Sequence, residues 1–282
     1  MRAASSIDGP MKAAAAAQWR PASRRAVLRA LWSTNLAEEL QYRGNFVASV
    51  LGTIFWLAMA LLTLAVFFRQ TERLGGWEFW EVVVLLGVFN TLAGIVDALL
   101  RPGIGSLAEQ VRSGALDLVL SRPVEPQFFV SFRRLAVWRL ADVVVGLALI
   151  GYALGRLAAP PTALQLATFA VAMLAAIAVV YALWVALMSL AFWFVKVENL
   201  SVIFDAVFSA ARYPVSAYPG ALRFLFVYLL PIAWTTTIPA SALTGRLDPA
   251  GAVVAAIVGA AALLVSRLLW KTALRRYTSA GG

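Results

Sequence analysis

The chain has 282 residues, of which 62% are hydrophobic and only 13% are charged, and its formal net charge is +10. It contains neither cysteine nor histidine, which excludes a disulfide framework, a thiol nucleophile, general base catalysis by imidazole and the usual zinc ligands. A soluble domain of this length carries about twice this share of charged residues. The hydrophobic residues are gathered in long runs, a pattern typical of a polytopic all-α membrane protein.

The beginning of the chain is polar, rich in alanine and basic, and it lacks the apolar core of a secretory signal peptide. We expect residues 1–23 to form a disordered cytoplasmic tail. Over residues 24–42, apolar side chains recur at three- and four-residue steps, which predicts an amphipathic helix. This helix lies at the inner membrane interface or packs on the protein's own cytoplasmic face. Its apolar positions include Leu28, Trp32 and Leu36.

Five apolar runs are each long enough to cross roughly 30 Å of hydrocarbon as a helix. They occupy residues 45–68, 80–100, 137–157, 163–193 and 250–270. A further apolar region, residues 199–240, is interrupted by prolines and supplies one more crossing. The sequence therefore predicts six membrane-spanning helices within a single domain over residues 24–276, followed by a short tail at residues 277–282.

The positive charge follows the predicted topology, which argues against a nucleic-acid partner. Lysine and arginine are concentrated in residues 1–44, in residues 101–134 between the second and third runs, and after Trp270. By the positive-inside rule, both ends of the chain and residues 101–134 are cytoplasmic. We call residues 101–134 the connecting segment.

Small residues in several runs predict close packing between helices. Gly151 and Gly155 form a G-x-x-x-G pattern in the third run. The last run has small residues at four-residue steps, and the fourth has a face of small residues. These positions are Gly251, Ala255 and Gly259 in the last run, and Thr168, Ala172, Ala175 and Ala176 in the fourth.

Polar side chains within the apolar regions are candidates for a substrate pathway, because a charge at the bilayer centre costs about 2.5–3.5 kcal/mol on insertion scales. The candidates are Asn90, Asp97, Asp142 and Asp205. Such residues either line a cavity or form ion pairs between helices, and Arg139, one turn before Asp142, is a candidate partner. The sequence leaves both interpretations open.

The connecting segment has the signals of short helices. Ser106 and Glu109 have the S-x-x-E spacing of a capping box, which predicts the start of a helix. Gly114 predicts its end, and Pro123 ends a second short helical piece. The alternative is an ordinary structured loop.

Residues 112–124, R-S-G-A-L-D-L-V-L-S-R-P-V, follow the second of six expected spans and resemble the permeases of ABC transporters of the second exporter class. The likeness is to a bacterial ABC-2 subfamily once described only as a domain of unknown function. Residues 213–239 agree with it, and the resemblance covers roughly residues 24–276. It implies a permease in the bacterial cytoplasmic (inner) membrane that exports its substrate by alternating access, as in multidrug efflux.

In that family two six-helix halves pair on two ATP-binding subunits. The present chain has no G-x-x-x-x-G-K-[ST] motif, so the resemblance implies that ATP and Mg²⁺ bind to a separate ABC ATPase subunit. We expect no catalytic, cofactor or metal site in this chain. The second half is an identical or a related chain, and the substrate is a cationic or amphipathic drug-like molecule, since the acidic residues favour it.

The resemblance also assigns residues 105–122 as the coupling helix that contacts the ATPase. The expected contact residues are Leu107, Glu109, Val111, Arg112, Gly114, Asp117 and Arg122. It places the fifth span at residues 199–213 and re-entrant or outward-facing helices at residues 213–245. Hydropathy alone instead indicates a fifth span at residues 221–240.

Two other functions agree with parts of the sequence. A stand-alone secondary transporter or channel suits buried acids and interrupted helices, but it gives the connecting segment no role. An intramembrane protease is suggested by Glu38, Glu39 and Arg43, which spell E-E-x-x-x-R. That chemistry also requires histidines, which this chain lacks.

Overall fold

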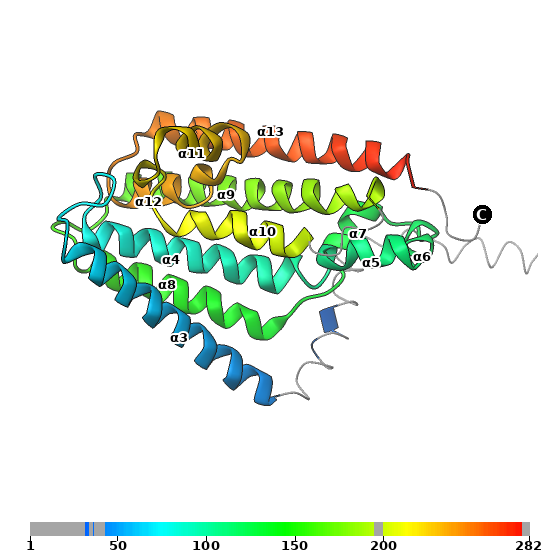
Figure 1. Ribbon diagram of the computed structural model, residues 1–282, viewed down its shortest axis with the longest axis horizontal. Helices are drawn as coiled ribbons and strands as arrows, with labels where there is room; N and C mark the ends of the chain where they lie inside the picture. The colour runs from blue at the N-terminus through cyan, green and yellow to red at the C-terminus, as the bar shows by residue number, and fades with distance from the viewer. Residues whose placement is uncertain (1–31, 34–35, 37–42, 195–199, 278–282) are drawn as a thin grey trace, which may run out of the picture.

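The computed structural model describes residues 32–33, 36, 43–194 and 200–277 (Figure 1). Within these ranges the chain forms helices and loops without a β-strand, and an isolated bridge joins Leu74 to Trp77. The expected all-α class is therefore confirmed for this part of the chain. The expected tail at residues 1–23, Leu28 and much of the expected interfacial helix lie outside the described residues.

Among the described residues, five helical stretches are long and apolar enough to cross a membrane. Their main helices are α3 (Arg43–Phe68), α4 (Phe79–Ile95), α8 (Leu140–Leu154), α9 (Ala163–Ser189) and α13 (Pro249–Leu274). Three are extended by short turns of other helix types, namely α4 by the π-helix η1 (Val96–Leu100), α8 by η3 (Val137–Arg139) and α9 by η4 (Leu190–Phe192). Helices α4, α8, α9 and α13 run roughly along the longest axis of the molecule, whereas α3 runs obliquely and diverges from α8 toward its N-terminal end (Figure 1).

Small residues hold two helix pairs together. Helices α4 and α8 approach so closely that a Cβ added at Gly146 would lie 2.4 Å from Thr91 Oγ1. In α9 and α13, a Cβ at Gly259 would lie 3.1 Å from the Cα of Ala175. Ala255 and all four residues of the expected small face of α9 are buried. The expected close packing is thus confirmed for the small face of α9 and for Ala255 and Gly259 of α13, whereas a Cβ at Gly251 would meet Leu247 and Asp248 beside it in the chain.

The G-x-x-x-G pattern of α8 does not form a helix interface, contrary to expectation. A Cβ at Gly151 would meet nothing within 4 Å, and one at Gly155 would meet only carbonyl oxygens of its own chain neighbourhood. The helix contacts α4 through Gly146, which lies about 140° around the helix axis from Gly151. The pattern therefore faces away from the neighbouring helix.

The connecting segment forms three short helices at one end of the bundle (Figure 1). They are α5 (Leu107–Arg112), α6 (Asp117–Leu120) and α7 (Pro126–Phe132), and α5 is preceded by the turn η2 (Ile104–Ser106). Gly114 has a φ of +73°, the left-handed conformation of a residue just after a helix. The predicted end of the first short helix is thus confirmed.

The predicted capping box at the start of α5 is not formed. Ser106 Oγ donates a hydrogen bond to the carbonyl oxygen of Gly103 at 2.8 Å and makes no capping bond to α5. Glu109 instead forms an ion pair with Arg112. The reason is local, because η2 runs directly into α5 and leaves Ser106 with a near-helical φ of −90° and ψ of 7°, whereas a capping residue has extended backbone.

The region before α13 is built from short, bent helices. Helix α10 (Leu200–Ser209) continues as η5 (Ala210–Arg212) and lies beside α4 and α9 (Figure 1). The chain then forms η6 (Val215–Ala217), α11 (Gly220–Phe224), η7 (Leu225–Leu229), η8 (Ile232–Trp234) and α12 (Thr237–Leu243). Residues 220–229 and 232–243 meet at a bend of 70° and form either a broken span or a re-entrant loop. The described helices thus provide five or six crossings.

An arginine joins two loops at the end of the bundle opposite α5–α7. Arg246, between α12 and α13, donates from Nε to Glu81 Oε1 of α4 at 2.7 Å and from Nη2 to the Gly76 carbonyl at 2.9 Å. Its guanidinium carbon lies 5.1 Å from the centre of the Trp77 ring. The loop before α13 is therefore attached to the loop between α3 and α4.

Candidate functional site

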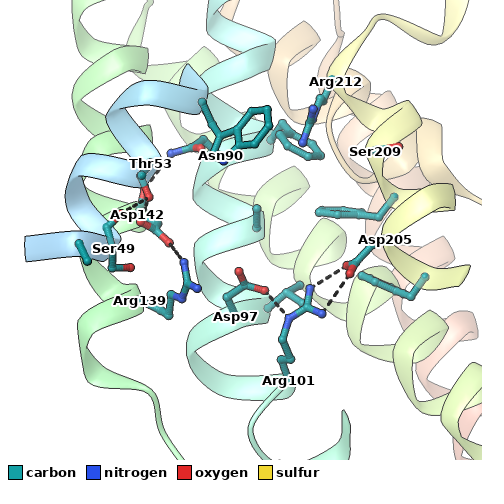
Figure 2. A pocket seen from close by; sticks show the side chains of 18 residues that line it. Ser49, Thr53, Asn90, Asp97, Arg101, Arg139, Asp142, Asp205, Ser209 and Arg212 are labelled. Carbon is teal, nitrogen blue, oxygen red and sulfur yellow. Dashed lines mark hydrogen bonds and ion pairs between the residues drawn. The ribbon is translucent and has the colours of Figure 1, made fainter. Parts of the chain in front are cut away.

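A cavity of about 630 Å³ lies between α3, α4, α8 and α10. Its volume is in the range of ligand-binding pockets. The four polar residues singled out in the apolar regions all line it, although they come from three separate parts of the chain. They are Asn90, Asp97, Asp142 and Asp205 (Figure 2).

At one end of this cavity, a single arginine binds two carboxylates. Arg101 Nε donates to Asp97 Oδ1 at 2.8 Å. Its Nη1 and Nη2 donate to the two carboxylate oxygens of Asp205 at 3.1 and 2.7 Å (Figure 2). Asp97 belongs to the π-helix η1, a helix type that is rare and often found at functional sites. This bidentate contact connects the residue that follows η1, at the C-terminal end of α4, to α10.

Burial by itself lowers the pKa of the Arg101 guanidinium. The hydrogen bonds and negative charges of Asp205 and Asp97 outweigh this effect, so the pKa lies above its usual value. Arg101 therefore stays charged at any pH that the protein experiences.

A second polar group surrounds Asp142, which is 6% exposed. Its carboxylate accepts a hydrogen bond from Thr53 Oγ1 of α3 and lies 3.6 Å from Arg139 Nη1. Asn90 of α4 donates from Nδ2 to the backbone carbonyl of Asp142 at 3.1 Å. The group thus links α3, α4 and α8, and the expected pair of Arg139 with Asp142 is confirmed (Figure 2).

The aromatic wall of the cavity carries a third arginine. The ring centres of Phe89 and Phe208 lie 5.0 Å apart, those of Phe204 and Phe208 lie 5.3 Å apart, and both pairs are stacked. The guanidinium carbon of Arg212 lies 5.1 Å from the centre of the Phe89 ring. In the part of the chain that the structure describes, no carboxylate pairs with Arg212. The sequence could have indicated that Arg212 lies on the same helix face as Asp205, since it follows Asp205 by about two helical turns.

Both interpretations that the sequence left open for the acids apply at once. Asp97, Asp142 and Asp205 line the cavity, and each of them also contacts an arginine. Their role toward a substrate stays a prediction. Over the described residues, no group of three acidic, histidine or cysteine side chains could hold a metal ion.

The expected ATPase-contact residues lie in α5, α6 and the turns around them, and they differ in exposure. Leu107 is fully buried in the chain's own core and offers no surface to a partner, and Val111 is half-buried. The charged side chains of Glu109, Arg112 and Arg122 are exposed, Asp117 begins α6, and Gly114 lies between the two helices. Sequence reasoning missed Leu118, whose side chain is 70% exposed.

Two of the expected interfacial residues are described. Trp32 donates a hydrogen bond from Nε1 to the carbonyl oxygen of Phe132, the last residue of α7, at 2.9 Å. Leu36 is 40% exposed. The segment before α3 therefore contacts the connecting segment.

The family model described as ABC-2 family transporter protein matches residues 54–281. The chain belongs to this family. No curated protein and no solved structure matches the chain. The matched residues of this ABC-2 family protein include most of α3 and all of α4, α8 and α10, the helices around the cavity. As a member, it is a membrane permease of an ABC transporter and not its catalytic subunit.

Proposed function

We propose that this ABC-2 family protein is the permease subunit of an ATP-driven exporter in the bacterial cytoplasmic membrane. Its substrate leaves the cytoplasm through the cavity between α3, α4, α8 and α10 by alternating access. The observation that carries this proposal is the cavity itself, because four polar side chains from apolar regions meet there. The distribution of lysine and arginine supports a cytoplasmic position for both termini and for the connecting segment.

A separate ABC ATPase subunit supplies the energy, since the sequence has no phosphate-binding loop. Helices α5 and α6 are the contact with that subunit. Leu118 provides an exposed apolar side chain there, and Glu109, Arg112 and Arg122 provide charges beside it. Because the connecting segment runs directly into η1 and η3, a rigid-body movement of the ATPase would move the ends of α4 and α8.

A second permease half, identical or related, packs against α3. Only 6% of the most apolar stretch of this helix is buried, and the side chains of Leu51, Phe55 and Trp56 are exposed. A surface of this kind is covered by lipid or by another apolar helix. The second half would close the open side of the cavity, to which α3 contributes Ala48, Gly52 and Trp56.

Helix α10 with η5 forms the fifth crossing, and residues 220–243 form a re-entrant hairpin. The bend of 70° supports this assignment. So does the position of α12, which lies toward the end of the bundle opposite α5–α7 (Figure 1). Helical breaks at membrane depth are tolerated where the backbone is buried in protein or lines a cavity.

ATP hydrolysis by the complex tests this function. The chain is co-expressed with its ABC ATPase, and the purified complex is reconstituted in liposomes. We expect Leu118→Ala and Arg112→Glu each to lower ATP hydrolysis by about tenfold, as truncation of a central interface residue does. The matched control is Leu222→Ala, which truncates an exposed leucine of α11, far from α5 and α6 along the bundle.

Two results would contradict the proposal. One is unchanged hydrolysis in both variants of an intact complex. The other is transport by the purified chain alone, driven by an ion gradient, which would establish the alternative of a stand-alone secondary transporter or channel.

A further inference from the structure

The charges that line the large cavity are unevenly paired. Asp142 is matched by Arg139, and Arg101 binds both Asp97 and Asp205. A cationic ligand would therefore meet carboxylates that already contact an arginine. Arg212 also lines the cavity, and its guanidinium has no hydrogen bond or carboxylate partner within the described ranges. Among the described residues, Arg212 is thus the charged side chain of the lining that has no partner of opposite charge.

The excess negative charge near Arg101 does not neutralise Arg212. Arg212 follows Asp205 by seven residues, which corresponds to about 10 Å along the helix. Among the described residues Arg212 and Asp205 form no ion pair, and Asp205 already binds Arg101. The contact with the Phe89 ring stabilises the guanidinium, but it leaves the five N–H donors of the group free. A planar fork of donors suits phosphate or carboxylate oxygens.

Arg212 also stands between two cavities. A second cavity of about 150 Å³ is lined by Met59, Thr63 and Leu64 of α3, and it shares Trp56 and Arg212 with the first. Along α3, the two linings extend from Ala48 to Leu64, which is about 24 Å of helix. That length is most of the roughly 30 Å of a hydrocarbon core. The two cavities therefore follow one another along α3, and Arg212 lines both of them.

The surroundings of Arg212 fit a ligand with an apolar body. Phe89, Phe204 and Phe208 form the stacked wall, and Trp56 lines both cavities. We propose that Arg212 binds the phosphate or carboxylate group of an amphipathic anion, whose apolar part packs on these rings. The assignment rests on the proposed function and gives the exported substrate a chemical class. It replaces the cationic substrate that the acidic residues alone suggest.

Direct binding tests the site without the ATPase. The full chain is placed in phosphatidylcholine nanodiscs and titrated by calorimetry, with empty nanodiscs subtracted. The probes are dodecyl phosphate and dodecyltrimethylammonium, which carry the same alkyl chain and opposite charges. We expect dodecyl phosphate to bind at least about tenfold more tightly, and Arg212→Gln to remove this preference. Arg212→Lys should retain much of it because the charge remains.

The matched control is Arg223→Gln, which removes an exposed arginine of α11 that lines neither cavity. We expect its affinity for dodecyl phosphate to be unchanged. Competition with inorganic phosphate then identifies the source of the anion. Displacement supports a soluble anion, and failure to displace supports a lipid-like one, since the apolar chain is then required.

The inference is overturned if Arg212→Gln binds dodecyl phosphate as tightly as the unmodified chain. Equal binding of the ammonium probe would also overturn it. The two proposals can fail independently, because binding of dodecyl phosphate is measured without the ATPase and does not depend on ATP hydrolysis. A coupled ATPase with no preference for the anionic probe would refute only the substrate class.

Discussion

Arg101 follows directly after the span Phe79–Leu100 and binds carboxylates from two different helices. Each of these carboxylates accepts a charge-assisted hydrogen bond from its guanidinium. The guanidinium also lies 5.4 Å from the ring centre of Trp184 on α9. One side chain therefore connects η1, α10 and α9.

The first prediction concerns this arginine. We expect Arg101→Gln to lower the free energy of unfolding by about 1–2 kcal/mol, between the values for exposed and buried ion pairs. The estimate is reduced for solvent screening because the Arg101 side chain is 37% exposed. Thermal unfolding in detergent measures it, with Arg69→Gln, an exposed loop arginine, as the control. Equal losses in both variants would contradict the prediction.

The pH dependence of the stabilisation by Arg101 follows from the direction of its pKa shift. The pKa of Arg101 is raised in the folded protein, so the stabilisation is complete below the unfolded pKa and is lost only as pH rises through the folded one. We therefore expect the difference between Arg101→Gln and the unmodified chain to be the same at about pH 6 and about pH 9.

At the scale of single residues, the sequence predicts contacts between near neighbours. Arg139 and Asp142 are three residues apart, so helical geometry alone brings them together. Asp97 and Asp205 come from distant parts of the chain, and only the packing of α10 against α4 allows them to share Arg101. Whether Arg212 has a partner also depends on tertiary packing, because packing decides which carboxylates lie near it.

Among the helices, close contact depends on which face a small residue occupies. Gly146 lies on the face of α8 that touches α4, whereas Gly151 lies on open surface. The sequence pattern identifies small residues but not the direction of the neighbouring helix. The pattern therefore predicted close packing correctly for α9 and for Ala255 and Gly259 of α13, but not for Gly251 of α13 or for the two glycines of α8. The S-x-x-E pattern failed for a similar reason, because the chain enters α5 from another helical turn.

The second prediction compares these two glycines. We expect Gly146→Ala to destabilise the protein by about 1–3 kcal/mol, because the added methyl group would overlap Thr91. Gly151→Ala should leave the stability unchanged or slightly higher, since alanine is the better helix former. The midpoint of thermal unfolding, Tm, distinguishes them. A larger loss for Gly151→Ala would refute the assignment of the packing face.

For the whole molecule, hydropathy predicts where the long helices lie but leaves the route before α13 open. Residues 199–240 contain one crossing, whether the fifth span is formed by residues 199–213 or by residues 221–240. These two interpretations place Ala217 on opposite sides of the membrane. The prolines explain the ambiguity, because they divide an apolar region into pieces too short to count as spans. Hydropathy also does not predict the cavity, because four separate helices contribute to its lining.

The third prediction uses the absence of cysteine from the chain. Single cysteines are placed at Ala217, at Ala159 between α8 and α9, and at Ser121 after α6, all of them exposed positions. We expect a membrane-impermeant maleimide to label Ala217→Cys and Ala159→Cys from outside intact cells, but not Ser121→Cys. Labelling of Ala217→Cys only after the cells are opened would show that residues 220–243 form the fifth span.

The hydrogen bond between Trp32 and Phe132 has a mechanical consequence. Trp32 precedes the first residue of α3, Arg43, by eleven positions, and Phe132 ends α7. Force applied at α7 would thus reach the segment before α3 as well as the two helices joined covalently to the connecting segment. Two of the four walls of the cavity, α4 and α8, would then respond to one displacement, and Trp32 would move with them.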